Sequence, residues 1–151
     1  RLLPDYSFNS PDLPDIDILV VPSAEHNMGK DLENKALIDW VSTMGAQADY
    51  SLSLCDGAFI LAQAGLVEGK VSTTFPSDIQ KYRSRFPLLT VIEEVSFVHD
   101  GSLLTSTGGA KSYDVALYLV ELLYGQAVAK KLGRGLVIDW DVNEYDYVVA
   151  D

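Results

Sequence analysis

The sequence predicts an α/β domain built as a three-layer sandwich, with a mainly parallel sheet and helices on both faces. Short apolar runs rich in β-branched residues alternate with stretches whose apolar residues recur at helical spacing. The chain has 151 residues and is 48% hydrophobic, which suits one folded domain with a substantial core. We therefore expect a single domain over residues 1–151.

The first half of the chain begins with a proline-containing lead-in over residues 1–15. Residues 16–21 are almost all apolar, so we expect a strand that is covered on both faces of the sheet. A polar loop follows over residues 22–30. Asp31 is then a candidate cap for a helix that ends at Gly45, and its apolar residues recur at helical spacing: Leu32, Ala36, Leu37, Trp40, Val41 and Met44.

The second half continues the same alternation. A buried strand over residues 50–54 precedes a helix, a glycine-containing turn and a short strand near residues 71–75. Asp100-Gly101 is a hairpin signal between two short apolar runs. Further elements are expected as follows: a helix from Ser77 to about Arg85, a strand at 89–92, helices at 113–124 and 126–132, and a terminal segment, 144–149, that could form a strand.

Cys55, the only cysteine, follows a predicted strand and precedes a predicted helix. A side chain at such a sharp turn projects at the carboxyl end of the sheet, where N–H groups of the next helix favour a thiolate or a developing oxyanion. This is the arrangement of a nucleophile elbow. The alternative is structural, because free cysteine is often a small buried hydrophobe. The local sequence leaves both interpretations open.

The charge and composition argue against several classes of function. The net charge is −11, with 22 acidic and 11 basic residues, which argues against a nucleic-acid surface. No apolar run approaches the length of a membrane span. A single cysteine cannot form an intrachain disulfide, and no signal peptide is evident, so we expect a cytoplasmic protein. We expect no metal and no cofactor, since ligand spacing and a dinucleotide fingerprint are both missing.

Several stretches together resemble the ThiJ/PfpI family of the class I glutamine amidotransferase-like superfamily, and its isonitrile-hydratase-like branch in particular. The matching segments are 15–22, 55–66, 68–76, 97–101 and 104–109, with the helix around 118–121. The resemblance implies a flavodoxin-like fold, a homodimer and a small-molecule substrate. It also implies that Cys55 is the nucleophile, with the backbone N–H of Asp56 as one oxyanion donor.

The same resemblance places other residues around the thiol. The loop Ser23-Ala24-Glu25 stands where the family has a pair of glycines, so the N–H of Ala24 should be the second oxyanion donor. Phe75 occupies a position that is histidine in many members, so the usual cysteine–histidine pair is broken. Thr107 and Gly108 complete the nearby pocket.

Only two histidines remain in the sequence, and His26 could replace the missing base. His26 lies in the loop expected against Cys55, with Glu25 as an orienting or acid group, although a surface loop histidine is an equal alternative. His99 falls in a predicted turn, and we expect it to be exposed to solvent.

Family members usually carry an N-terminal strand–helix–strand segment before the equivalent of residues 1–15, and the chain begins at Arg1 without it. That segment supplies a central strand, so without it the sheet would have an exposed apolar edge. We therefore expect this chain to be the larger piece of a longer protein, whose missing segment is removed, disordered, or present as a separate fragment that completes the sheet.

Two functions remain open from the sequence. The first is a cysteine-dependent hydratase or hydrolase that acts on a small carbon–nitrogen or carbonyl electrophile, with isonitrile hydration as its sharpest form. The alternative is a non-catalytic ligand-sensing or redox-responsive domain that kept the fold and lost the acid–base partner at Phe75.

Overall fold

The computed structural model describes residues 3–150 and confirms the predicted α/β class. Its main sheet has five strands in the order β1-β2-β6-β5-β7. These strands are β1 (Ile18–Val21), β2 (Tyr50–Leu54), β5 (Phe97–Asp100), β6 (Leu103–Ser106) and β7 (Tyr147–Ala150). All neighbouring pairs are parallel except the β5–β6 hairpin, which turns at Gly101 as the Asp100-Gly101 signal predicts. The terminal strand is β7, which pairs with β5.

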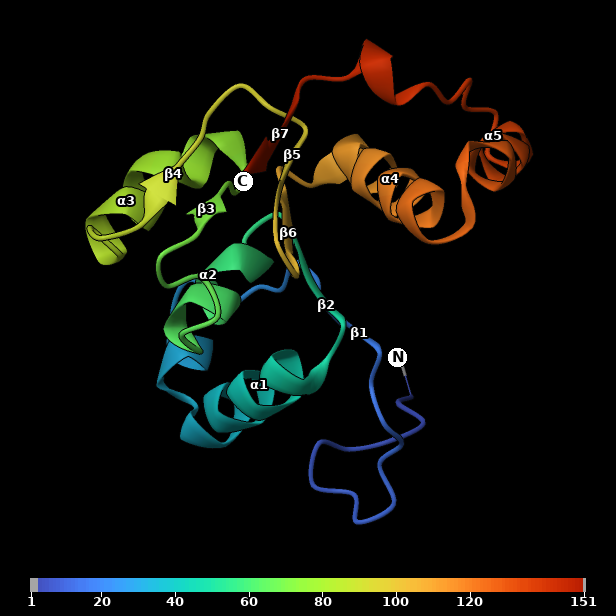
Figure 1. The fold of residues 1–151 in the computed structure, drawn as a ribbon. Helices are drawn as coiled ribbons and strands as arrows, with labels where there is room; N and C mark the ends of the chain where they lie inside the picture. The colour runs from blue at the N-terminus through green and yellow to red at the C-terminus, as the bar shows by residue number, and fades with distance from the viewer. Residues whose placement is uncertain (1–2, 151) are drawn as a thin grey trace.

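Helices lie on both sides of this sheet (Figure 1). One side carries α1 (Lys35–Gln47) and the short α2 (Gly57–Gln63); the other carries α4 (Ser112–Tyr124), with α5 (Gln126–Gly135) packed against it. A further group contains α3 (Ile79–Arg85), β3 (Val71–Ser72) and β4 (Thr90–Val91), with the two short strands paired in parallel and β3 in contact with β5.

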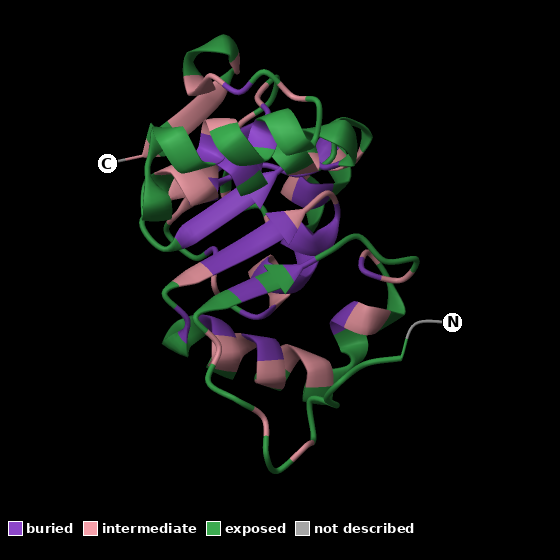
Figure 2. Cartoon of the chain, turned by 90° about the vertical axis from the view of Figure 1, so that its right-hand side faces the viewer, coloured by how far each residue is buried: buried purple, intermediate pink, exposed green. Residues whose placement is uncertain are grey.

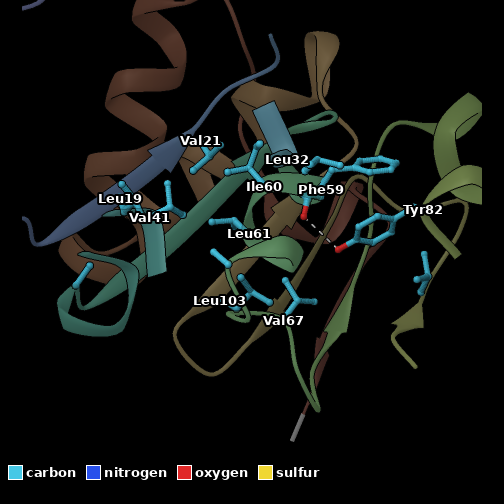
Figure 3. Close-up of a cluster of buried hydrophobic side chains, with 14 of the residues drawn as sticks. Leu19, Val21, Leu32, Val41, Phe59, Ile60, Leu61, Val67, Tyr82 and Leu103 are labelled. Carbon is cyan, nitrogen blue, oxygen red and sulfur yellow. Dashed lines mark hydrogen bonds between the residues drawn. The ribbon is translucent and has the colours of Figure 1, made fainter. Parts of the chain in front are cut away.

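Buried residues concentrate in the central strands, as Figure 2 shows. The largest apolar cluster fills the space between the sheet and the layer of α1 and α2, and it extends to α3 through Phe59 and Tyr82. In Figure 3 the Tyr82 hydroxyl donates to the backbone carbonyl of Ala58. A second cluster joins Leu52, Phe97 and Leu104 to α4. The two cores hold β2 and β6 rigidly, and these strands carry the candidate site at their carboxyl ends.

Strand β1 differs from its predicted environment. Only Leu19 and Val21 are buried, whereas Ile18 and Val20 are 38% and 46% exposed. The prediction of cover on both faces is therefore wrong, because β1 is the edge strand and α4 lies over β2, β5 and β6 instead. The expectation that a further segment completes the sheet stays a prediction.

The first long helix begins later than the sequence suggests. Asp31 belongs to a 3₁₀ turn, Lys30–Glu33, and the true cap is Asn34, whose side chain accepts from the backbone N–H of Leu37. The helix also continues through Gly45 to Gln47. Gly45 lies against the side chains of Leu66 and Ser51, and a Cβ at this position would collide with them. The packing therefore favours a glycine within the helix.

The backbone just after α5 is strained at one residue, Val137. Val137 has a φ of 61° and is 95% exposed. Its N–H donates to the carbonyl of Arg134, and the N–H of Ile138 donates to that of Gly133, which together form a Schellman motif. The left-handed position of this motif favours glycine, and a β-branched residue there is strained.

We predict that Val137→Gly raises the free energy of unfolding by about 1 kcal/mol, because the substitution removes the left-handed strain without losing buried surface. Val128→Gly in the first turn of α5 is the matched control and should lower stability by about 0.5 kcal/mol. Urea unfolding of both variants measures the difference. A loss of stability in Val137→Gly would contradict this account of the helix end.

Candidate active site around Cys55

Cys55 occupies the sharp turn between β2 and α2, and its φ of 56° lies in the left-handed region. Hydrogen bonds fix the backbone on both sides of the side chain. The Cys55 N–H donates to the carbonyl of Ser106 at 3.0 Å, and the Thr74 hydroxyl donates to the carbonyl of Cys55 at 3.0 Å. A non-glycine residue keeps such a conformation only when its surroundings enforce it, and this kind of strain is concentrated at functional sites.

Two glycines allow the turn to pack tightly against neighbouring strands. A Cβ added to Gly108 would lie 2.5 Å from the Cβ of Cys55, and Gly108 itself has a φ of 80°. A Cβ added to Gly57 would lie 2.1 Å from the backbone carbonyl oxygen of Val21 at the end of β1. The elbow is therefore held between the ends of β1 and β6, and neither glycine can gain a side chain without displacing backbone.

The Cys55 thiol is partly buried, and burial is the main cause that raises its pKa above the ordinary cysteine value. Hydrogen bonds from the backbone N–H of Asp56 and the side chain of Ser23 oppose this shift, whereas the carboxylates of Asp56 and Asp78 add to it. The effects that raise the pKa are together larger than those that lower it. Helix α2 spans only seven residues, so its N-terminus gives limited support to a thiolate.

Asp56 is buried beside the thiol and is tied to the loop after β1 through Asn27. The Asn27 side-chain amide donates to Asp56 Oδ1 at 3.2 Å and to the backbone carbonyl of Pro22 at 2.8 Å. Asn27 is only 4% exposed. It thus fixes the loop against the elbow, and Ser23 in the same loop reaches the thiol.

Sequence reasoning missed the side chains of Asn27 and Ser23. Both belong to the polar loop of residues 22–30, and the only available signal was that this loop should face Cys55. Asn27 is distinguished by its burial, and burial depends on the packing of the whole chain.

The predicted base and acid group, His26 and Glu25, lie on the outer part of this loop. The His26 Nε2 atom lies 3.8 Å from Glu25 Oε2, and the Glu25 side chain is 88% exposed. Neither residue is among the described groups that shift the pKa of the Cys55 thiol. The role of His26 as a base therefore stays a prediction.

The other predicted pocket residues lie around the elbow as follows. Thr107 is buried and its hydroxyl donates to the carbonyl of Ser96, while Gly108 contacts Cys55 directly. Phe75 follows Thr74 and is 38% exposed, so its aromatic ring is not part of the sealed core, and its equivalence to the family's histidine stays a prediction. The backbone of Ala24 is exposed in the loop after β1 and its carbonyl accepts from Asn27.

His99 is not the exposed turn residue that the sequence suggests. It lies within β5 and is half-buried, with its Nδ1 2.8 Å from the Tyr118 hydroxyl and its Nε2 2.7 Å from the carbonyl of Gly101. The Gly101 carbonyl can only accept, so Nε2 carries the proton and Nδ1 accepts from Tyr118. Strand β5 runs from Phe97 to Asp100, whereas the apolar run in the sequence ends at Val98. His99 therefore lies in the sheet.

Residues 3–150 contain no group of three or more histidine, cysteine or carboxylate side chains placed to hold a metal ion. Within the same residues, no helix combines the length and the apolar character that a bilayer crossing requires.

Comparison with known proteins gives matches to one family. Residues 1–122 match the model of the DJ-1/PfpI family. The isonitrile hydratase of Pseudomonas putida is 33% identical over 131 residues, which cover 86% of this chain and 54% of that protein. The HTH-type transcriptional regulator CdhR of Pseudomonas aeruginosa is 29% identical over 103 residues, covering 68% of this chain and 30% of the regulator. The chain thus spans about half of the hydratase and less of the regulator.

A solved structure gives the same result for the fold. The crystal structure of a ThiJ/PfpI family protein from Pseudomonas syringae superposes with a TM-score of 0.80, at 23% sequence identity, and covers 93% of this chain and 56% of that one. The shared architecture confirms the flavodoxin-like fold that the sequence predicts.

We predict that iodoacetamide alkylates native Cys55 with a pH midpoint above ~8.5, the reference for a free cysteine, because the thiolate is the reactive form and the folded site disfavours it. Asp56→Asn should lower the midpoint, since the amide removes a negative charge and its oxygen can still accept from Asn27. Asp12→Asn, an exposed control outside the site, should leave the midpoint unchanged. A native midpoint below that of the unfolded chain would overturn this description of the thiol.

Proposed function

This chain belongs to the DJ-1/PfpI family, and we propose that it is a cysteine-dependent hydratase or hydrolase of small molecules in which Cys55 is the nucleophile. The observation that carries the proposal is the left-handed backbone of Cys55, fixed by Ser106 and Thr74 at the carboxyl end of a parallel strand. Such a turn presents the side chain of its central residue at the sheet edge.

Isonitrile hydration is the reaction that best suits a thiol with a raised pKa. The S–H group adds to the terminal carbon of the isonitrile, so that a C–S bond forms, the proton passes to that carbon and a thioimidate results. Water then adds to the thioimidate carbon while the nitrogen gains a proton. The C–S bond breaks, the sulfur recovers a proton and an N-substituted formamide leaves. The sum is one isonitrile and one water giving one formamide, with no redox change.

This sequence of steps explains why a protonated thiol is not a disadvantage. A thiolate enzyme needs a separate acid to protonate the isonitrile carbon, whereas an S–H group brings its own proton to the addition. The backbone N–H of Asp56 makes a hydrogen bond that lowers the pKa of the Cys55 thiol, although burial raises it more. We assign to it, together with the Ala24 N–H, the stabilisation of negative charge that develops beside the reacting carbon.

Activation of the attacking water requires a base, and His26 with Glu25 is the proposed source. The Nε2 of His26 faces Glu25 at 3.8 Å, an arrangement in which the carboxylate can orient the ring. His26 is partly exposed and belongs to the loop that Asn27 ties to the elbow, and we assign it the water-activating role on that ground.

We predict that the protein converts n-butyl isonitrile to N-butylformamide, and that Cys55→Ser lowers the rate at least about 1,000-fold because the serine hydroxyl is a much weaker nucleophile. Appearance of the formyl proton signal in ¹H NMR measures the product. Thr43→Ser, on the exposed side of α1, serves as a control and should retain the wild-type rate. Undiminished turnover in Cys55→Ser would exclude the proposed nucleophile.

The same assay decides the role of the histidine. His26→Ala should slow turnover roughly 100-fold if the ring acts as the base, and Lys30→Gln in the same loop should not. If both variants retain the full rate, His26 is a surface loop residue and the base lies elsewhere.

A ligand-sensing domain is the second candidate, and two observations favour it. Phe75 replaces the usual histidine, and one relative of this chain is a transcriptional regulator. The raised thiol pKa disfavours the redox-responsive version, because oxidation proceeds through the thiolate. Wild-type protein that binds small molecules and hydrates none of a panel of isonitriles would support the sensing function over the catalytic one.

A further inference from the structure

Asn27 is the buried residue of a loop, residues 22–30, whose other members are exposed or half-buried. A buried amide requires hydrogen-bond partners, and the side-chain nitrogen of Asn27 has two. It donates to the carbonyl of Pro22 at 2.8 Å, at the start of the same loop, and to Asp56 Oδ1 at 3.2 Å, at the elbow. One amide group therefore closes the loop on itself and joins it to the turn that carries Cys55.

Packing holds the two ends of this loop but not its middle. At the near end, a Cβ added to Gly57 would lie 3.2 Å from the carbonyl oxygen of Pro22, so the loop starts directly against the elbow. At the far end, Met28 packs on the largest apolar cluster. Residues 23–25 between them are exposed. The position of this middle part relative to the sulfur consequently depends on the hydrogen bonds of Asn27.

The polar and charged groups that act on the sulfur come from three segments. They are the side chain of Ser23, the backbone N–H and carboxylate of Asp56, and the carboxylate of Asp78. Ser23 alone among them belongs to the loop that Asn27 fixes, and its hydrogen bond lowers the pKa of the Cys55 thiol. The Asp56 carboxylate opposes thiol ionisation, and its contact with Asn27 gives it a second role, as the charged acceptor that anchors the loop.

We propose that Asn27 is a positioning residue, which through Asp56 holds the Ser23 hydroxyl and the backbone N–H of Ala24 beside the Cys55 sulfur. Asn27 itself touches neither the sulfur nor a reacting group, and it acts by fixing the loop that carries those donors. The part of the proposal that concerns Ala24 rests on the function proposed above. The part that concerns Ser23 does not, because the thiol and its hydrogen bond exist without any substrate.

A double-mutant cycle on the pH midpoint of Cys55 alkylation by iodoacetamide tests the proposal. Ser23→Ala should raise the midpoint, because it removes a hydrogen bond that favours the thiolate. Asn27→Leu should raise it as well, since the loop that carries Ser23 is no longer fixed to the elbow. In the Ser23→Ala background, Asn27→Leu should cause a smaller rise than it does in the wild type. An equal rise in both backgrounds, or no rise in either, would overturn the proposal.

Asn34→Leu is the matched control, because the Asn34 side chain also makes a structural hydrogen bond, accepting from the N–H of Leu37 at the start of α1. It should lower the urea midpoint of unfolding and leave the alkylation midpoint unchanged. If it moves the alkylation midpoint as Asn27→Leu does, general destabilisation explains both results and the positioning role is wrong. Asn27→Ser replaces Asn27→Leu if the latter does not fold: its hydroxyl is too short to reach Pro22 and Asp56 together, so the same rise and the same dependence on Ser23 are expected.

Turnover separates this proposal from the catalytic one. Asn27→Leu should lower kcat for n-butyl isonitrile about tenfold and change KM less, because the misplaced Ala24 N–H stabilises the developing charge poorly while the substrate still binds. Full kcat in this variant would contradict the placement of Ala24 by Asn27. If the wild-type protein itself hydrates no isonitrile, the proposed chemistry fails, and the alkylation cycle still decides whether Asn27 positions Ser23 at the thiol.

Discussion

The structure depends on the close approach of three chain segments at the carboxyl ends of the central strands. Gly57 lies against the last carbonyl of β1, and Gly108 lies against the Cα and Cβ of Cys55. These contacts leave no room for a relaxed turn between β2 and α2, so Cys55 adopts a left-handed φ and is locked by hydrogen bonds to Ser106 and Thr74. The position of the sulfur is therefore a consequence of how the sheet and α2 pack, and it needs no ligand to be maintained.

The electrostatics of the same junction decide what chemistry the sulfur can perform. Partial burial and the carboxylates of Asp56 and Asp78 keep the proton on the thiol, against the hydrogen bonds from Asp56 N–H and Ser23. Enzymes that attack carbonyl groups through a preformed thiolate use positive neighbours and a histidine partner. This site has a buried carboxylate next to the sulfur, and no histidine of residues 3–150 is among the groups that shift the pKa of the thiol. Those features suit a reaction in which sulfur and proton are delivered together.

Sequence patterns predicted the parts of the fold that local residues determine. The strand before Cys55, the hairpin at Asp100-Gly101 and the helix after Gly109 have strong apolar periodicity or a specific turn signal. The failures arise from tertiary packing. The exposure of Ile18 and Val20 depends on where α4 lies, and the burial of Asn27 and His99 depends on contacts with Asp56 and Tyr118, which are 29 and 19 residues away in the chain. Cys55 was identifiable because its signal is local, whereas its pKa depends on Asp78 and Ser23, which come from other segments.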